Sequence, residues 1–508
     1  MTAKSKSLTG AASATLLDWS AINWKLVQKH VYRLQMRIAK AKRENRPGKV
    51  KALQWILTHS LYAKVFAVRQ VTQNQGRNTP GVDNILWKTT KVKANAAISL
   101  KRQGYKAQPL RRINIPKKNG KKRPLGIPTM KDRAMQALYL YALEPIAETT
   151  ADKNSYGFRP KRSTADAIQQ CFILFSRKHN AEWILEADIK ACFDKINHQW
   201  LLNNIPMDKV ILKQWLSSGY VENQTLMPTR EGTPQGGIIS PTLANMKLDG
   251  LENAIKAIAK RSDRINVVRY ADDFIVSCFS KEILESKVKP IIGSFLEDRG
   301  LSLSKEKTKI THIEEGFNFL GFNIRKYLKG RKLLIKPAKD NIKSILKDIR
   351  KTISHNKAAS TEQLIRLLNP KLRGWAYYYR HTVAKDTFSL IDHRTYQTLY
   401  RWIRKRHPNK NWKWCKNKYF RSKGLRNWIF STQVYSKTAG YKDHLDLFNM
   451  GHLAIIRHRK IRAEANHFDP IFKEYFEQRK LPSMKCSPYH WIERMQPELS
   501  NFKMYLPN

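Results

Sequence analysis

Two adjacent carboxylates, Asp272 and Asp273, end the sequence Tyr270-Ala271-Asp272-Asp273. The flanking segments, 265–269 and 274–278, are rich in β-branched and aromatic residues, which predicts two strands joined by a tight turn. One Asp is common in a turn, but two adjacent carboxylates repel each other, and a simple turn gains nothing from that repulsion. Divalent cations need hard, anionic oxygen ligands, so the pair favours a metal site over a polar turn.

A third carboxylate, Asp188, follows the apolar segment Trp183–Ala187. An acid at the end of an apolar strand must be paired, bound to a metal or placed at the rim. Taken alone, a strand-end Asp is more often a helix cap. Two-metal sites take their carboxylates from more than one strand, so the presence of Asp272 and Asp273 favours Asp188 as a third ligand.

The composition indicates a partner with many negative charges. The 508 residues include 95 Lys and Arg against 40 Asp and Glu, which gives a net charge of +55. This excess predicts binding to a polyanion, with nucleic acid as the first candidate and an acidic membrane surface as the second. No segment approaches the roughly 18 consecutive apolar residues of a membrane-spanning helix, so a membrane-embedded protein is disfavoured.

The cysteines provide no framework for zinc or for disulfides, because none of them forms a CxxC pair. They are Cys171, Cys192, Cys278, Cys415 and Cys486. The pattern argues against a zinc knuckle and a disulfide-stapled fold and favours a reducing compartment. Residues 1–17 contain no apolar secretory core. A cytoplasmic protein is therefore favoured over one with a transit peptide.

The elements that must position these acids are both helices and strands. A basic hairpin is predicted over 111–128, because Asn119-Gly120 is a strong turn signal. Apolar residues at three- and four-residue steps predict helices. These helices span about 22–69 with a break at 43–49, then 131–150, 241–258, 281–299, 340–354, 362–381 and 386–406. Strand signals fade after Gly330, so we expect a mixed α/β body followed by a helical bundle.

Several short sequence blocks are distributed along the chain between residues 78 and 322. The blocks are Asn78–Asp83, Ile115–Lys117, Arg123–Pro128, Ser155–Pro160, Ala187–Asp194, Gly232–Gly237, Ser240–Pro241, Tyr270–Asp273 and Phe319–Phe322. In content and order they resemble reverse transcriptases of the group II intron-encoded maturase type, over residues 24–467. The Tyr-Ala-Asp-Asp block alone is a weak signal, whereas the ordered set is very specific.

The resemblance implies an α+β fold with the right-hand polymerase architecture. Fingers and palm would be followed by an α-helical thumb, which is also the maturase domain, and by a small basic DNA-binding tail. The implied domains are an N-terminal helical extension at 1–90, fingers and palm at 91–328, the thumb at 329–420 and a DNA-binding region at 421–508. Many relatives carry a C-terminal His-Asn-His endonuclease. Nothing after Leu481 resembles it, so we expect no second-strand cleavage by this chain.

The resemblance also assigns the carboxylates. Asp188, Asp272 and Asp273 would be the catalytic residues and would hold two Mg²⁺ ions, with Asp188 and Asp272 as the main ligands. The ions would activate the primer 3′-hydroxyl and stabilise the leaving pyrophosphate. Mg²⁺ suits this role because it prefers carboxylate and phosphate oxygens and keeps several waters.

The nucleotide-binding residues implied by the resemblance come from three blocks. Lys117 and Arg123 would bind the phosphates of the incoming nucleotide; a solvated basic hairpin is the alternative. Phe193 is at the family's sugar-gate position, where an aromatic ring would clash with a 2′-hydroxyl, and core packing is the alternative. Gln235 and Gly236 would line the nucleotide and template pocket, since glycine lets the backbone approach closely.

The segment 367–379 resembles the maturase block of the thumb, and 405–412 continues its basic character. Aromatic residues stack on bases and cations bind phosphates, so this mixture suits RNA. The alternative is that the aromatic residues pack in the core of their own helices. The RNA-binding candidates are Arg373, Trp375, Tyr378, Arg380, Lys405 and Arg406.

The function implied is an RNA-directed DNA polymerase that binds a group II intron RNA and assists its splicing. It would copy that RNA into DNA by target-primed reverse transcription during intron mobility. Its partners would be intron RNA, target DNA, an RNA template with a DNA primer, and dNTPs, in a bacterial cytoplasm near the nucleoid and without a membrane. Alternatives are a reverse transcriptase domesticated for host or defence use, a splicing-only maturase, and an RNA-dependent RNA polymerase or primase. The retained acids disfavour the splicing-only maturase, and the Tyr-Ala-Asp-Asp form with Phe193 disfavours the RNA polymerase or primase.

Overall fold

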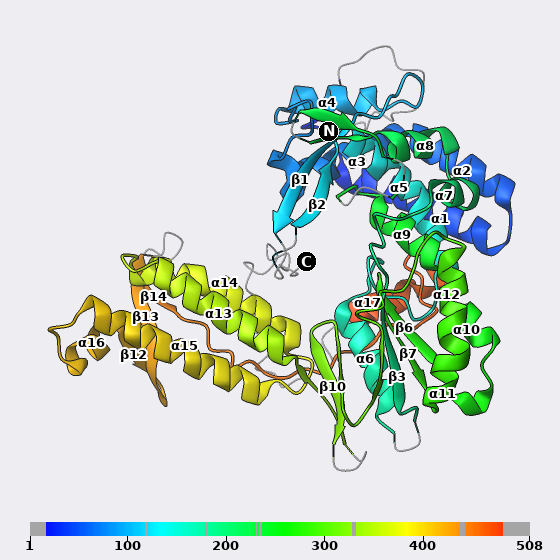
Figure 1. The fold of residues 1–508 in the computed structure, drawn as a ribbon. Coiled ribbons are helices and arrows are strands. Elements are labelled where there is room, and N and C mark those ends of the chain that lie inside the picture. Colours follow the sequence, from blue (N-terminus) through cyan, green and yellow to red (C-terminus); the bar gives the residue numbers. More distant parts are fainter. Residues whose placement is uncertain are drawn as a thin grey trace.

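A body of helices and sheets carries a long helical arm on one side (Figure 1). The computed structural model describes residues 17–116, 120, 122–177, 180–222, 224–229, 231–232, 236–327, 332–435 and 442–480. Within these residues, no helix is both long enough and apolar enough to cross a membrane.

The N-terminal helices share one hydrophobic core with the helix that follows the first hairpin. Their bounds are α1 (Trp24–Arg43), α2 (Pro47–His59), α3 (Leu61–Gln73) and α4 (Thr90–Ser99). The first three pack on α5 (Met130–Thr150), which is buried around most of its circumference, and α4 packs on α3. In α1 the apolar residues Val27, Val31 and Ile38 recur on one face and enter this core.

The predicted basic hairpin is confirmed as two strands of the fingers. Strand β1 (Leu110–Pro116) pairs antiparallel with β2 (Lys122–Ile127), while β4 (Tyr220–Glu222) runs parallel to β1 and pairs with β5 (Thr225–Met227). The sheet order is β2-β1-β4-β5. The turn at 117–119 lies outside the described residues.

A second four-stranded sheet, in the order β6-β7-β3-β8, forms the palm. Its strands are β3 (Trp183–Asp188), β6 (Asn266–Tyr270), β7 (Asp273–Cys278) and β8 (Lys309–His312). Side chains alternate between its two faces. Ile184, Val268 and Ile275 pack with α6 (Thr164–Phe175), whereas Leu185, Val267 and Val276 pack with the helices of the opposite face.

The helices of that opposite face differ from the sequence expectation. One helix was expected over 241–258, but there are two, α9 (Ser240–Leu248) and α10 (Leu251–Ala257). Gly250 separates them with a positive φ of 96°, a conformation that glycine adopts readily and that ends a helix. Similarly, 281–299 begins as α11 (Lys281–Ile283), passes through a π-helical turn and continues as α12 (Lys289–Glu297).

A short sheet joins the palm to the arm. Its strands β9 (Phe317–Phe319), β10 (Phe322–Tyr327) and β11 (Lys332–Pro337) are antiparallel. The expectation that strand signals fade after Gly330 was therefore wrong, because β11 and, further along the chain, three more strands follow that residue. The arm itself is helical, as predicted. Its long helices are α13 (Lys339–His355), α14 (Thr361–Tyr379) and α15 (Lys385–Arg406).

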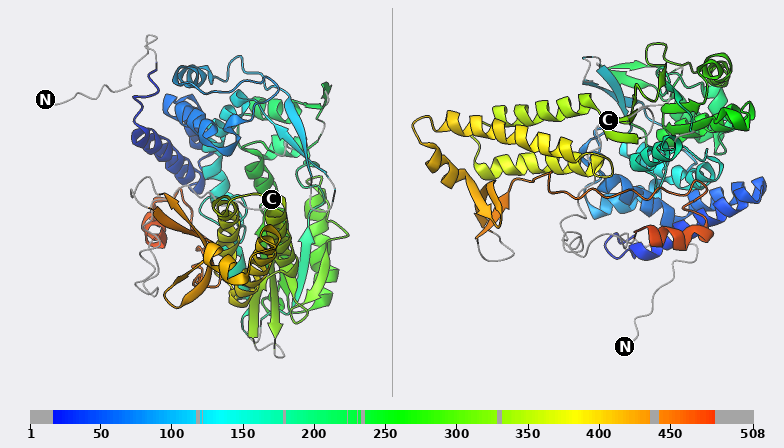
Figure 2. Two further views of the ribbon diagram at one scale, coloured as in Figure 1. Left: turned by 90° about the vertical axis from the view of Figure 1, so that its left-hand side faces the viewer. Right: turned by 90° about the horizontal axis from the view of Figure 1, so that it is seen from below.

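The chain beyond the arm helices has two separate parts. At the far end of the arm, α16 (Trp412–Tyr419) packs beside β12 (Phe420–Lys423), β13 (Arg426–Tyr435) and β14 (Lys442–Asp446). The chain then runs back along the arm and reaches the palm and α1, where the last described helix is α17 (Lys473–Lys480), as the right view of Figure 2 shows. The sequence pattern predicted neither the sheet nor the return.

Candidate active site

The three predicted carboxylates meet at the ends of adjacent palm strands. In the antiparallel pairing of β3 and β7, Asp188 stands directly opposite Asp273. Tyr270 pairs with Asp273 across β6 and β7, so Ala271 and Asp272 form a two-residue turn. Ala271 has a positive φ of 57°, which is uncommon for a residue with a Cβ and marks a turn held by its surroundings.

A neighbouring loop holds this turn from behind. The backbone N–H of Tyr156 donates to the carbonyl of Arg269 at 2.9 Å, and Ser155 forms a parallel bridge with Arg269. Gly157 lies so close that a Cβ there would approach the Ala271 nitrogen to 2.4 Å. The loop therefore requires glycine at 157, and its position sets the position of the acidic turn.

The carboxylates at this site repel one another strongly. Burial, Asp272 and Asp188 together raise the pKa of Asp273 to about 7. Burial and Asp188 likewise raise the pKa of Asp272, although Lys307 and Arg123 counteract the shift. Asp273 keeps part of its surface open to solvent. Burial of the rest and repulsion from the neighbouring carboxylates both raise its pKa.

One lysine partly offsets this negative charge. The Lys307 ammonium lies 2.8 Å from Oδ2 of Asp188, and the hydrogen bond to Asp188 raises the pKa of Lys307. The sequence reading missed Lys307. It is one of several lysines in the segment 305–309, and nothing in their spacing distinguishes it from its neighbours.

The donor set suits a hard divalent cation. Three carboxylates share the site with one ammonium group close by, so negative charge remains in excess, and a divalent ion would relieve it. The three side chains are not yet arranged as ligands, because among the described residues no group of three or more His, Cys, Asp or Glu side chains could hold a metal ion. The chemistry of the donors fits Mg²⁺, and a metal would have to draw them together.

The fingers contribute positive charge to the same site. Arg123 lies on β2 with its side chain exposed, and it is close enough to lower the pKa of Asp272. The fingers hairpin therefore faces the palm acids. Lys117, the other predicted phosphate ligand, lies outside the described residues, as does Gln235.

Phe193 and Gly236 are placed between the fingers and the palm. Phe193 is half-buried and packs against the hydrophobic cores of both units. Gly236 has a positive φ of 116°, and a Cβ there would come within 2.7 Å of the Gly126 carbonyl oxygen. The glycine thus lets its loop lie against β2, on the strand that carries Arg123.

Two aromatic residues expected to contact RNA are used inside the protein. Trp375 packs against Tyr379, with ring centroids 4.3 Å apart. Tyr378 donates its hydroxyl to the carbonyl of Leu320 at 2.9 Å and stacks on Phe322. Both side chains are partly buried, and this packing favours the alternative of core packing at the base of the arm.

The basic candidates on the arm are more accessible. Arg373 is exposed, and Lys405 and Arg406 are exposed at the end of α15. Arg380 is half-buried, with its guanidinium 4.9 Å from the centroid of the Tyr377 ring. Three of the four cations therefore remain candidates for contacts with phosphates.

An antiparallel palm with acids at its strand ends, fingers above them and a helical arm beside them defines a nucleic-acid polymerase of the right-hand class. Three family models match the chain. Residues 115–324 match "Reverse transcriptase (RNA-dependent DNA polymerase)", and residues 19–100 match "N-terminal domain of reverse transcriptase". Residues 342–420 match "Group II intron, maturase-specific domain".

Bacterial relatives agree with these matches. The group II intron-encoded protein LtrA of Lactococcus lactis subsp. cremoris is 31% identical over 409 residues, which cover 62% of this chain and 68% of LtrA. Protein YkfC of Escherichia coli K12 is 30% identical over 302 residues, which cover 51% of this chain and 79% of YkfC. The chain belongs to the family of group II intron-encoded reverse transcriptases with a maturase domain.

A telomerase structure from Candida albicans also matches. It shows 13% identity and a TM-score of 0.36, covering 62% of this chain and 61% of the telomerase chain.

Proposed function

We propose that this reverse transcriptase extends a DNA primer on an RNA template at Asp188, Asp272 and Asp273, with two Mg²⁺ ions. The observation that carries the proposal is the register of β3 and β7, which brings acids from two strands to one edge. When bound, the ions would supply the Lewis acidity that activates the primer hydroxyl and stabilises the leaving group.

The residues of the chain would orient and neutralise the nucleotide. Arg123, on the fingers side of the site, would bind its phosphates and stabilise the negative charge that grows in the transition state. Lys307 would place a positive charge and a proton beside the departing pyrophosphate. Phe193, between the cores of fingers and palm, would lie against the sugar and exclude a 2′-hydroxyl.

The arm would bind intron RNA and assist its splicing. Support comes from the maturase-specific match over 342–420 and from the exposed cations Arg373, Lys405 and Arg406. Target DNA would be bound by the basic sheet region at the end of the arm. The bacterial relatives support a site of action in the cytoplasm.

Primer extension combined with a splicing assay tests the proposal. The double substitution Asp272→Asn with Asp273→Asn should abolish Mg²⁺-dependent DNA synthesis and leave RNA affinity and assisted splicing nearly unchanged. Sequencing the RNA that co-purifies with the protein should return an intron with its exons. Equal loss of splicing and synthesis would refute the separation of the two functions, and a mixture of cellular RNAs would refute the intron assignment.

A further inference from the structure

The segment that returns from the arm, residues 449–479, is called the strap here. It follows the arm to its base, where the Ile456 N–H donates to the carbonyl of Arg380 at 3.0 Å. It then crosses α6 and reaches α1, where the Tyr32 hydroxyl donates to the His467 carbonyl at 2.8 Å and Arg43 forms an ion pair with Asp469. The strap thus contacts the arm, the palm and the N-terminal helices in succession.

The first anchor of the strap is a carboxylate of the palm. Asp166 has a fully buried side chain, and its Oδ2 accepts from the backbone of Ser163 to cap α6. Its Oδ1 accepts three bonds from the strap: from Nε2 of His458 at 2.8 Å, from the Ile461 N–H at 2.7 Å and from Nη2 of Arg479 at 2.7 Å. Burial alone would raise the pKa of Asp166, but the contacts with His458 and Arg479 outweigh it and lower that pKa.

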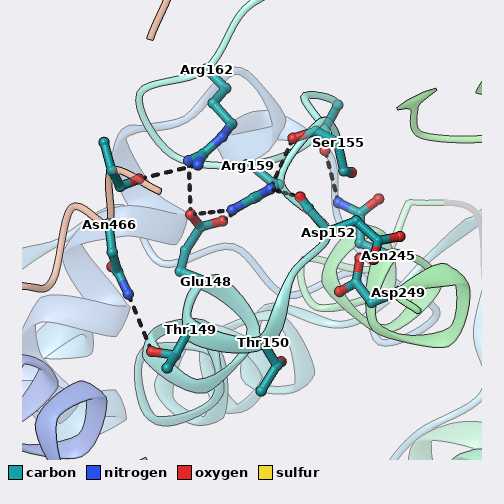
Figure 3. A network of polar contacts seen from close by, with 12 residues as sticks. Glu148, Thr149, Thr150, Asp152, Ser155, Arg159, Arg162, Asn245, Asp249 and Asn466 are labelled. Atoms are coloured by element: carbon teal, nitrogen blue, oxygen red, sulfur yellow. Dashed lines mark hydrogen bonds and ion pairs between the residues drawn. The ribbon is translucent and has the colours of Figure 1, made fainter. Parts of the chain in front are cut away.

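The second anchor is a pair of buried arginines, drawn in Figure 3. Arg162 donates to the carbonyl oxygens of Ala463 and Ala465 in the strap, at 3.4 and 3.1 Å, and to Oε2 of Glu148 at 3.0 Å. Glu148 also accepts two bonds from Arg159, at 2.7 and 3.0 Å. Without the strap, Arg162 would lose two acceptors in a buried site, where unpaired polar groups are costly.

Arg159 connects these ion pairs to the catalytic turn. Its Nη1 donates to the carbonyl oxygens of Asp152 and Ser155, at 2.7 and 2.9 Å. Ser155 begins the loop whose residue Gly157 lies against Ala271. A continuous set of hydrogen bonds therefore runs from the strap, through Arg162, Glu148 and Arg159, to the backbone behind Asp272.

We propose that the strap is a positioning element of the polymerase, and that Arg479 and His458 act through Asp166 and the buried arginines to hold the catalytic turn. The inference rests on the proposed role of Asp272 and Asp273. It reassigns the strap, which the sequence placed within a basic DNA-binding tail. Arg479 of the strap is used within the protein, since its side chain is only 16% exposed and is bound to Asp166.

Substitution of two strap arginines, one mostly buried against the palm and one exposed, distinguishes a positioning role from a general effect of positive charge. Arg479→Ala and Arg459→Ala each remove one positive charge from the strap, but the Arg459 side chain is exposed. The measurement is pre-steady-state incorporation of one dNTP on an RNA template with an annealed DNA primer, which yields a burst rate, a burst amplitude and a primer–template Kd.

Arg479→Ala should lower the burst rate by about 5- to 20-fold, as expected for a small displacement of reacting groups, with amplitude and Kd unchanged. Arg459→Ala should leave the burst rate at the wild-type value. Arg479→Lys should recover part of the rate, because it keeps the charge and one donor. If Arg479→Ala proves unstable, His458→Gln provides the second variant, with a smaller decrease in burst rate expected.

Two results would overturn the proposal. Equal weakening of primer–template binding by both alanine variants, with unchanged burst rates, would make the strap a nucleic-acid-binding tail. A lower burst amplitude with a normal burst rate would make it only a support for folding. If the wild-type protein gave no Mg²⁺-dependent burst, the proposed function itself would fail, which is a distinct result.

Discussion

The Lys307 ammonium lies 2.8 Å from a carboxylate oxygen of Asp188, at the edge of the palm where three acids meet. Asp188 and Asp273 face each other across two strands, and this lysine forms an ion pair with one member of that crowded anionic site. A cation that reaches into such a site from a flexible stem is suited to move from a carboxylate to a phosphate during a reaction cycle.

Lys307→Ala should therefore lower the rate of nucleotide incorporation by about 10²-fold, a loss typical of a proton donor or charge at the reacting centre. Lys307→Arg should keep the charge and lose part of the rate. Lys305→Ala is the matched control, because Lys305 is an exposed lysine of the same segment. Single-turnover incorporation measures all three, and equal rates for both alanine variants would contradict the role.

Gly157→Ala should displace the catalytic turn, because the new Cβ would meet the Ala271 nitrogen at 2.4 Å. Relief of that overlap should cost about 1–3 kcal/mol of stability and at least about tenfold in rate. Gly374→Ala is the control, since nothing lies within 4 Å of a Cβ there. In the middle of α14 it should stabilise the protein by about 0.5–1 kcal/mol. Thermal unfolding and primer extension provide both readouts.

His381 should make stability depend on pH at the base of the arm. Burial and the nearby His458 lower its pKa to about 4, against the opposing effect of Asp166. Because the folded pKa is depressed, the unfolded chain binds a proton first as the pH falls below about 6.5. Stability is therefore lost between pH 6.5 and 4, by about 2 kcal/mol at pH 5.

The measurement is the unfolding midpoint at pH 7 and at pH 5. His381→Phe should reduce the difference between the two midpoints, whereas His393→Gln, which changes an exposed histidine on α15, should leave it as in the wild type. An unchanged difference in His381→Phe would contradict the assignment.

Lys405 should contribute to RNA binding through phosphate contact alone. Lys405→Ala should weaken affinity for the RNA recovered with the protein and reduce the slope of log K against log salt by about 1. Lys287→Ala, which changes an exposed lysine in the π-helical turn between α11 and α12, should change neither. A filter-binding titration across salt concentrations measures the slopes, and equal slopes for Lys405→Ala and wild type would remove Lys405 from the interface.

Local pattern was sufficient for the acids and the strands that carry them. The short apolar segment Trp183–Ala187 and the runs around Asp272 depend on neighbours in sequence, and the structure has the strands there. The long arm helices were also predicted, because apolar spacing over many residues is a strong signal.

Contacts between distant residues could not be predicted in the same way. Lys307 reaches Asp188 from 119 positions away, and Arg479 reaches Asp166 from 313 positions away. The aromatic residues of 412–430 look irregular in sequence because they pack with one another across α16 and the terminal sheet, as Trp412 does on Trp428. The contacts of Trp375 with Tyr379 and of Tyr378 with Leu320 were beyond the sequence for the same reason, since sequence does not show which neighbour a ring meets.

The strap gives the arm two points of attachment to the body. An arm attached to the body only at Pro337 would be able to rotate about that one point. Because the chain returns and binds Asp166, the arm is connected to the body both where it begins and through the strap that follows it. A force on the sheet at the far end of the arm would therefore act on the body at both attachments, including the palm residues that bind the strap.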